Sequence, residues 1–166
     1  MQNSITNERD QFLALDDDQA LKLCRVDRFR GSGRGGQKRN VTDSAVRVTH
    51  VATGYVGSSD ATRSQMTNRK LAVRRLRDEM ALRWRMAPAP EWHGNWAPSQ
   101  KNRDYARWVA VVLDVIAEEA YRLGPAARRL GVGTGRLGRD LGGNGQLWQH
   151  VNTERQRLGL SILRKN

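Results

Sequence analysis

The sequence contains little of what disulfide-stabilised, metal-dependent or membrane-spanning proteins need. One cysteine, Cys24, excludes an internal disulfide and a cysteine-based zinc site. The three histidines, His50, His93 and His150, are far apart in the sequence with no acidic cluster beside them, so we expect no metal centre. No apolar run reaches the roughly 18 residues of a membrane span, and no signal segment opens the chain. We therefore expect a soluble, cytoplasmic protein with no membrane partner.

Acidic residues are scarce compared with basic ones. The 166 residues include 29 Lys and Arg but 17 Asp and Glu, which gives a formal net charge of +12. Such a surplus favours polyanionic partners, chiefly nucleic acid. An evenly spread surplus would be a general property of an Arg-rich protein, but this one is concentrated. With 38% apolar residues, the chain can bury the core of one domain, or of a small domain with a helical extension.

Alternating polarity in the first half predicts a small antiparallel sheet. Residues 24–29 and 45–51 alternate between apolar and polar side chains, as strands do. Ala52-Thr53-Gly54 indicates a turn, after which residues 55–58 can return as a third strand. The Gly-rich residues 30–44 then form a loop that projects between the first two strands.

Two helices are expected around this sheet. Asp16, Asp17 and Asp18 can cap a short helix over residues 19–24. Residues 63–85 predict one long helix with an apolar stripe facing the sheet. The stripe consists of Met66, Val73, Leu76, Met80 and Trp84. Its other faces carry Arg63, Arg69, Lys70, Arg74, Arg75, Arg77, Arg83 and Arg85. Eight basic residues against two acidic ones give this helix a net charge of +6, which favours an RNA-facing surface over a solvated face of mixed charge.

The second half indicates a linker followed by helices. Residues 86–100 hold three of the four prolines, so we expect the long helix to end there and Trp92 and Trp96 to pin the linker to a domain. The next helix carries an apolar stripe and is expected to end near Gly124-Pro125. The stripe is Trp108, Val111, Val112, Val115 and Ile116.

Residues 125–141 then predict a helix-turn-helix. Ala127, Gly131 and Leu137 stand where that motif uses a small residue, a turn and a core residue. Three glycines weaken the second helix, so a nucleic-acid reader and a purely structural three-helix bundle both remain open. A last helix is expected over residues 146–158. The chain is thus an α+β protein with three predicted regions: 1–86, the linker 87–100 and the helical region 101–166.

The Gly-rich segment, RGSGRGGQKRNVTDS, has the composition of a ligand-approaching loop. Its glycines permit positive φ and close backbone approach, and its successive N–H groups can bind an anion. It is not a Walker A loop, because no Gly-Lys-Ser/Thr follows at the required spacing. It is not a dinucleotide-binding loop either, because a strand follows it instead of a crossover helix.

Four ordered blocks of residues make the segment more specific. They are Ser32-Gly33 with Gly35-Gly36-Gln37; Asn40 with Ser44-Ala45-Val46-Arg47; His50 with Thr53-Gly54; and Arg63-Ser64-Gln65 with Asn68. Together they resemble the catalytic domain of bacterial class I peptide chain release factors and of the small ribosome-rescue hydrolases. The resemblance covers roughly residues 20–86, and the whole chain is similar to short release factor-like proteins with a C-terminal helical extension. Arg39, Ala52 and Thr62 depart from the family pattern without touching the Gly-Gly-Gln triplet.

The resemblance implies a ribosome-dependent peptidyl-tRNA hydrolase that needs no cofactor. Gly35, Gly36 and Gln37 would be catalytic, with the Gln37 main-chain N–H donating to the developing oxyanion and its side chain selecting water. Shaping of the loop is expected from Ser32, Gly33, Arg34 and Asn40. Contacts with large-subunit rRNA or peptidyl-tRNA are expected from Arg47, Arg63, Ser64, Gln65, Asn68, Arg69, Lys70 and Arg74.

Codon-independent action, as in ribosome rescue, is the expected mode. The 166 residues leave no room for a stop-codon-reading domain. The chain also departs from the rescue hydrolases, because it ends without the long Lys/Arg-rich tail by which they occupy an empty mRNA channel. Three alternatives stay open at this point. The protein can bind RNA or DNA through its helix-turn-helix-like region without catalysis, release peptides from tRNA away from the ribosome, or occupy the release-factor site without chemistry.

Overall fold

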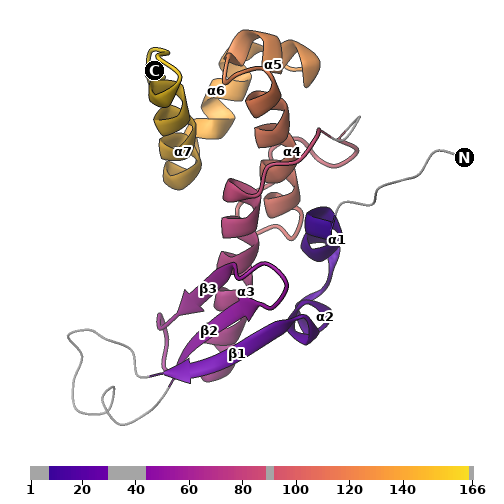
Figure 1. The fold of residues 1–166 in the computed structure, drawn as a ribbon, viewed down its shortest axis with the longest axis vertical. Helices are drawn as coiled ribbons and strands as arrows, with labels where there is room; N and C mark the ends of the chain where they lie inside the picture. Colours follow the sequence, from indigo (N-terminus) through magenta and orange to yellow (C-terminus); the bar gives the residue numbers. More distant parts are fainter. Residues whose placement is uncertain (1–7, 30–43, 89–91, 165–166) are drawn as a thin grey trace, which may run out of the picture. The chain divides into compact units, whose positions relative to one another are not determined.

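Figure 1 shows a computed structural model of the chain, which describes residues 8–29, 44–88 and 92–164. The chain divides into two compact units, Met1–Met80 and Ala81–Asn166. The first contains α1 (Glu8–Ala14), α2 (Asp17–Lys22), β1 (Cys24–Phe29), β2 (Ala45–His50), β3 (Val56–Ser59) and most of α3 (Gln65–Arg83). The second contains α4 (Tyr105–Glu118), α5 (Leu123–Arg129), α6 (Thr134–Gly142) and α7 (Gly145–Arg157). The predicted α+β class is confirmed.

The three strands form one antiparallel sheet in the order β1-β2-β3 (Figure 1). Cys24 pairs with His50 and Phe29 with Ala45, so β1 and β2 match along their full length. The β2–β3 turn is closed by the His50 amide, which donates to the Tyr55 carbonyl at 2.9 Å. Gly54 takes φ +74 in that turn, a conformation that favours glycine. The predicted strands and turn are confirmed, with β3 displaced by one residue from 55–58 to 56–59.

Helix α3 packs on one face of the sheet with an unusually close backbone approach at Gly57. A β-carbon placed on Gly57 would lie 2.1 Å from the Ala72 carbonyl oxygen and 2.3 Å from the Leu76 amide nitrogen. Only glycine fits there. Val46 and Val48 of β2 are buried, as are three of the five residues predicted to face the sheet, namely Val73, Leu76 and Met80.

Two features of α3 differ from the prediction. Met66 is 70% exposed and Trp84 is half-buried. The buried face of α3 begins at Asn68, so the first turn, which carries Met66, extends beyond the residues that pack on the sheet. Arg77, predicted to lie on the RNA-facing surface, is 8% exposed instead. Its guanidinium donates to the Asp17 carboxylate at 2.6 Å and to a backbone carbonyl of the α1–α2 connection at 2.8 Å.

The two N-terminal helices close this unit. Asp16 caps α2: its carboxylate accepts from the Gln19 amide at 2.8 Å, and the Gln19 side chain reciprocates to the Asp16 amide at 3.3 Å. The predicted short helix is therefore confirmed, although it ends at Lys22. Helix α1 was not predicted, because its surroundings are polar in sequence. Phe12 and Leu13 of α1 are buried, and the Phe12 ring meets the edge of the His50 ring at 4.7 Å.

In the second unit, α4 is almost wholly buried, as its apolar stripe predicts. It ends at Glu118, earlier than predicted, because Ala120 and Tyr121 take positive φ (51° and 58°). Pro125 lies in the first turn of α5, where the missing N–H has no helical partner to lose. The predicted helix-turn-helix is present as α5 and α6, and Gly131 supplies the turn with φ +68.

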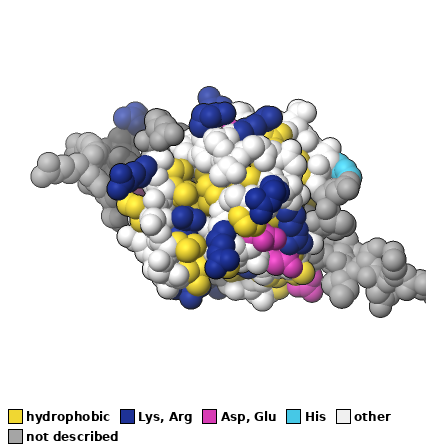
Figure 2. Space-filling view, turned by 90° about the horizontal axis from the view of Figure 1, so that it is seen from above, with side chains coloured by type: hydrophobic (Ala, Val, Ile, Leu, Met, Phe, Trp, Pro, Cys, Tyr) yellow, Lys and Arg dark blue, Asp and Glu magenta, His cyan; other side chains and the backbone are white. Residues whose placement is uncertain are grey.

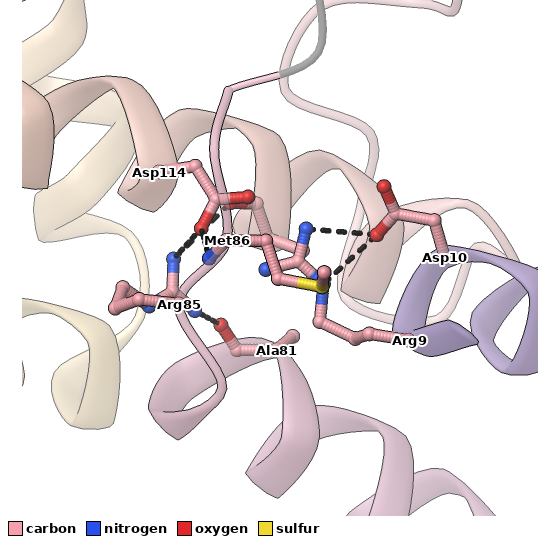
Figure 3. Close-up of polar contacts among 7 residues, drawn as sticks. Arg9, Asp10, Ala81, Arg85, Met86 and Asp114 are labelled. Carbon is pink, nitrogen blue, oxygen red and sulfur yellow. Dashed lines mark hydrogen bonds and ion pairs between the residues drawn. The ribbon is translucent and has the colours of Figure 1, made fainter. Parts of the chain in front are cut away.

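Two sets of side-chain hydrogen bonds connect residues outside the helices of this unit to α4 and α6. Trp96, predicted to pin the linker, donates from Nε1 to the Asp140 carboxylate at 2.6 Å, and its ring meets Trp108 edge-on at 5.8 Å. Asp114, 1% exposed, accepts from Arg85 at 2.8 Å and from the Met86 amide at 3.1 Å (Figure 3). Arg85 also donates to the Ala81 carbonyl. Arg85, predicted on the RNA-facing surface, is therefore engaged in the protein's own structure.

Candidate functional site

The predicted catalytic segment is attached at one end of the sheet. Residues 30–43, which contain Ser32, Gly33, Arg34, Gly35, Gly36, Gln37 and Asn40, lie outside the described residues. The residues on either side are described. Phe29 ends β1, Ala45 begins β2, and the two are register partners. The two attachment points of the segment therefore lie side by side, at one end of the β1–β2 pair.

The first attachment point is packed by a basic side chain. The Arg47 guanidinium lies over the Phe29 ring, 5.1 Å from its centroid. Arg47 projects from the same face of the sheet as Phe29, because cross-strand partners Asp27–Arg47 and Phe29–Ala45 share a face. Arg47, predicted to bind RNA, is exposed. It can therefore support the end of β1 and still present positive charge to solvent.

The second attachment point is held by Asn68. This residue is 0% exposed, and its side-chain nitrogen donates to the Ser44 carbonyl at 2.8 Å and to the Thr62 carbonyl at 2.7 Å. Its side-chain oxygen accepts from the Thr62 amide at 3.0 Å, the Thr62 hydroxyl at 3.2 Å and the Ser59 hydroxyl at 3.4 Å. Asn68 was expected to contact RNA; the structure corrects this, because a buried amide with all these partners is not presented to a ligand.

Ser64 also has a structural role at the start of α3. Its hydroxyl accepts from the Thr67 amide at 3.2 Å, which is the bond of an N-cap residue. Its carbonyl accepts from the Thr62 hydroxyl at 3.1 Å. Thr62 therefore connects the cap to Asn68. The Arg-Ser-Gln turn, α3 and the start of β2 are thus joined by one continuous hydrogen-bond network.

Exposed positive charge gathers around this network. Arg63, Arg69 and Lys70, which we call the basic cluster, are exposed and make no ion pair or hydrogen bond with any described residue. Arg74 and Gln65 are half-buried. Arg75 is exposed but donates to the Ser58 carbonyl at 2.6 Å. Of the eight basic residues predicted on the RNA-facing surface, Arg77 and Arg85 are therefore assigned to internal contacts. The three residues of the basic cluster are the ones that are exposed and make no ion pair or hydrogen bond with a described residue.

Burial shifts the pKa values of two titratable side chains of this unit, Cys24 and His50. Desolvation raises the pKa of Cys24 to about 11, against a smaller lowering by the Arg77 charge, so the side chain is a neutral thiol at pH 7. Burial lowers the pKa of His50 below its usual range, and the nearby Glu8 charge partly offsets this. His50 Nδ1 lies 2.7 Å from the Thr53 hydroxyl. His50 is therefore a neutral core residue that closes the β2–β3 turn.

The described part of the chain contains neither a metal-binding cluster nor a membrane-spanning helix. There, no three His, Cys, Asp or Glu side chains are grouped so as to hold a metal ion. Nor is any described helix both long and apolar enough to cross a bilayer.

Sequence reasoning missed two residues that matter here. Gly57 stands in a short strand, and an isolated glycine within a strand pattern is itself a sign of close backbone approach. Asn68 was recognised by its position in the fourth block, but its role was assigned to RNA. An Asn four residues after the helix cap, preceded by hydroxyl residues, has local partners within reach, and that signal could have suggested an internal role.

Comparisons with known proteins found a matching family and several similar proteins. Residues 18–107, more than half of the chain, match the RF-1 domain family. The chain is 44% identical over 75 residues to peptide chain release factor 2 of Chlamydia abortus. The aligned region covers 43% of this chain and 20% of that protein. The chain is 54% identical over 57 residues to peptide chain release factor 1 of Leptospira biflexa, covering 34% and 16%. The chain thus spans about a fifth or less of the length of these relatives.

Proposed function

Because the chain belongs to the RF-1 domain family, we propose that it hydrolyses the ester joining a nascent peptide to tRNA on the ribosome. The observation that carries the proposal is the intact Gly35-Gly36-Gln37 triplet inside the matched region, in a chain whose relatives are named release factors. The basic cluster at the start of α3 supports it, because ribosomal partners are polyanionic.

Water is the nucleophile in the proposed reaction, and the ribosome holds the ester. Gly35 and Gly36 let the backbone come close to the tRNA end, since side chains there would collide with it. The Gln37 main-chain N–H donates a hydrogen bond to the negative charge that develops on the carbonyl oxygen of the ester. The Gln37 side chain restricts the nucleophile to water. No cofactor takes part.

The described residues would act by holding the two ends of the catalytic segment. Arg47 packs on Phe29 at the first end, and Asn68 donates to the Ser44 carbonyl at the second. A small catalytic group must be positioned to within a fraction of an ångström for a donor to stabilise a transition state. Rigid attachment points lower the entropy lost when the segment engages the ester.

The test is peptide release from purified ribosomes that carry peptidyl-tRNA, assayed with a stop codon and with no codon in the decoding site. Gln37→Pro removes the main-chain donor and should lower the release rate by about 10²–10³. Gln37→Ala is the matched control, because it removes the side chain but keeps the N–H. Full release by the Pro variant would refute the role of the amide. Release that requires the stop codon would refute codon independence, which is part of the proposal.

Contacts with RNA phosphate by the basic cluster are tested by salt dependence. Arg69→Ala with Lys70→Ala should weaken ribosome binding and reduce the slope of log affinity against log salt by about 1.5. Arg129→Ala is the control, because Arg129 is paired with Glu118 at 2.5 Å and Glu119 at 3.3 Å. An unchanged slope in the double variant would remove this surface from the proposed interface.

A second candidate function is binding of nucleic acid without catalysis. The observation that favours it is the helix-turn-helix formed by α5, the Gly131 turn and α6, in which Ala127 and Leu137 are buried as the motif requires. Two binding assays separate the two functions: sedimentation of the protein with ribosomes, and a mobility shift of duplex DNA by the protein. Tight duplex binding without peptide release would favour the second.

A further inference from the structure

The helical unit contains a cavity that the proposed hydrolysis does not use. Its volume is about 480 Å³, within the range of pockets that hold small organic groups. The cavity is bounded by α6, the start of α5, α7 and the residues after α7. Its lining residues are Leu123, Gly135, Gly138, Arg139, Gly142, Gly143, Trp148, Leu163 and Arg164.

The cavity is open along α6 because three of the four α6 residues that line it are glycines. Gly135, Gly138 and Gly142 recur at helical spacing and all line it. A β-carbon on Gly138 would have no atom within 4 Å, so close packing does not explain the glycine. Each glycine costs a helix stability relative to alanine. The glycines that leave this face open therefore make α6 less stable than alanines at the same positions would.

The opposite wall is fixed by hydrogen bonds from α7. The Asn152 side chain accepts from the Leu163 amide at 2.7 Å, and Arg155 donates to the Ser161 carbonyl at 2.9 Å. These bonds turn the chain after α7 back along the helix. Leu163 and Arg164 consequently face the cavity from a held position.

The lining combines an aromatic ring with two cations and no carboxylate. Trp148 is half-buried and contributes to the wall of the cavity. Arg139 and Arg164 form no ion pair with any residue that the structure describes. The Arg139 guanidinium lies along the glycine face, 3.7 Å from where a β-carbon of Gly135 would stand.

The charge around the cavity favours an anionic occupant. Residues 101–166 include twelve Lys and Arg and six Asp and Glu, which leaves a surplus of six positive charges. Figure 2 shows Lys and Arg side chains among hydrophobic side chains on the face that it draws, with fewer Asp and Glu side chains.

We propose that this cavity binds an unpaired nucleotide of an RNA strand. The base stacks on Trp148 against the glycine face, while Arg139 and Arg164 pair with its flanking phosphates. A flat aromatic group with negative charge on both sides matches this lining better than an acidic peptide, which has no ring for Trp148. A duplex does not fit, because its bases are stacked inside it. The proposal is independent of ester hydrolysis and stands or falls separately from it.

The test is an NMR titration of the full chain with a single-stranded adenylate hexamer. Amide signals of Gly135, Gly138, Gly142 and Gly143 should shift during the titration, while Gly54 of the first unit should not. Gly138→Leu places a side chain in the cavity from a position where the added β-carbon has no atom within 4 Å. It should weaken the affinity measured from Gly142 and Gly143 about 5- to 150-fold, the contribution of one stacked base.

Matched variants separate the cavity from general charge and from folding defects. Gly124→Leu is the control, because Gly124 is also helical and also open around its β-carbon position but does not line the cavity. It should leave the affinity unchanged. Trp148→Leu keeps much of the volume and should weaken binding as Gly138→Leu does. Arg139→Ala with Arg164→Ala should lower the salt slope by about 1.4.

Several results would overturn the proposal. Shifts confined to glycines outside the cavity would place the RNA elsewhere. Equal affinities of the Gly138→Leu and Gly124→Leu variants would exclude the cavity. Tighter binding of an RNA duplex would assign the unit to groove recognition. Adenosine monophosphate or a glutamate hexapeptide that bound as tightly as the RNA hexamer would replace the RNA strand with a free nucleotide or an acidic peptide.

Discussion

Removing the Asn68 side chain is the sharpest test of how the first unit holds the candidate site. Asn68→Ala deletes five hydrogen bonds, of which three are at or below 3.0 Å. A hydrogen bond between uncharged groups contributes about 1 kcal/mol net, and the Ser44 and Thr62 carbonyls would lose their donor. We expect a loss of about 3 kcal/mol in the free energy of unfolding of this unit. For a unit of this size, that lowers its Tm by about 12–24 °C.

Asn68→Asp probes the same site with almost the same shape. It keeps the acceptor oxygen but turns the other atom into a second carboxylate oxygen, which faces the Ser44 and Thr62 carbonyl oxygens. Burial and this repulsion raise the pKa of such a carboxyl in the folded state. The folded state then binds the proton more tightly than the unfolded state, so stability rises as pH falls through the folded-state pKa. The variant should therefore recover part of its stability in acid, whereas Asn68→Ala should not.

The distribution of tryptophan makes the measurement selective. All five tryptophans lie after residue 80, so their fluorescence reports the second unit alone. Hydrogen exchange of the β2 amides reports the first unit. Protection in β2 should fall in the Asn68 variants while the fluorescence transition stays in place. Thr67→Ala, at the neighbouring exposed position, is the control. An Asn68→Ala variant as stable as this control would refute the role assigned to the network.

Two further substitutions test the packing and charge of α3. Gly57→Ala should destabilise the first unit by at least about 1–3 kcal/mol, because α3 must move by more than about 1 Å to clear the new methyl group. Urea denaturation followed by hydrogen exchange of the β2 amides measures this loss of stability. An unchanged stability would refute the close approach of α3 to Gly57. Burial raises the pKa of Asp78 to about 6, although the charges of Arg74 and Arg77 act to lower it. The charged carboxylate therefore destabilises the folded state above about pH 6, and this effect is absent below about pH 4, where the carboxyl is protonated in both states. Asp78→Asn should therefore stabilise the unit at pH 7, on the order of 1–2 kcal/mol, with the gain disappearing by pH 4; a gain independent of pH would contradict this.

Local signals predicted most of the secondary structure. Alternating polarity located β1 and β2, and the acidic residues before α2 marked its capped start. The same signals failed where a short element lacks a periodic stripe. Helix α1 has two buried apolar residues in a polar stretch, and only packing against the sheet reveals it. Proline was misleading near α5, since Pro125 lies in the first turn of that helix, and the helix before it has already ended at Glu118.

The candidate site was predictable in its residues but not in their division of labour. The ordered blocks around Gly35-Gly36-Gln37 are a property of the sequence, and so is the surplus of positive charge on residues 63–85. Which of those charges remain available is not. Arg77 pairs with Asp17, 60 residues earlier, and Asn68 bonds to Ser44, 24 residues earlier. Such partners are invisible to any local pattern.

The sequence by itself determined the family, the order of the strands and of the helices after α1, and the sign of the net charge, because each depends on residue type and short-range spacing. The tertiary structure alone decided that Asn68 is buried, that Met66 is exposed, that Gly57 lies against α3, and that the α6 glycines face a cavity. The physical reason is that burial and hydrogen bonding depend on which distant segments meet. That is settled only when the chain packs on itself.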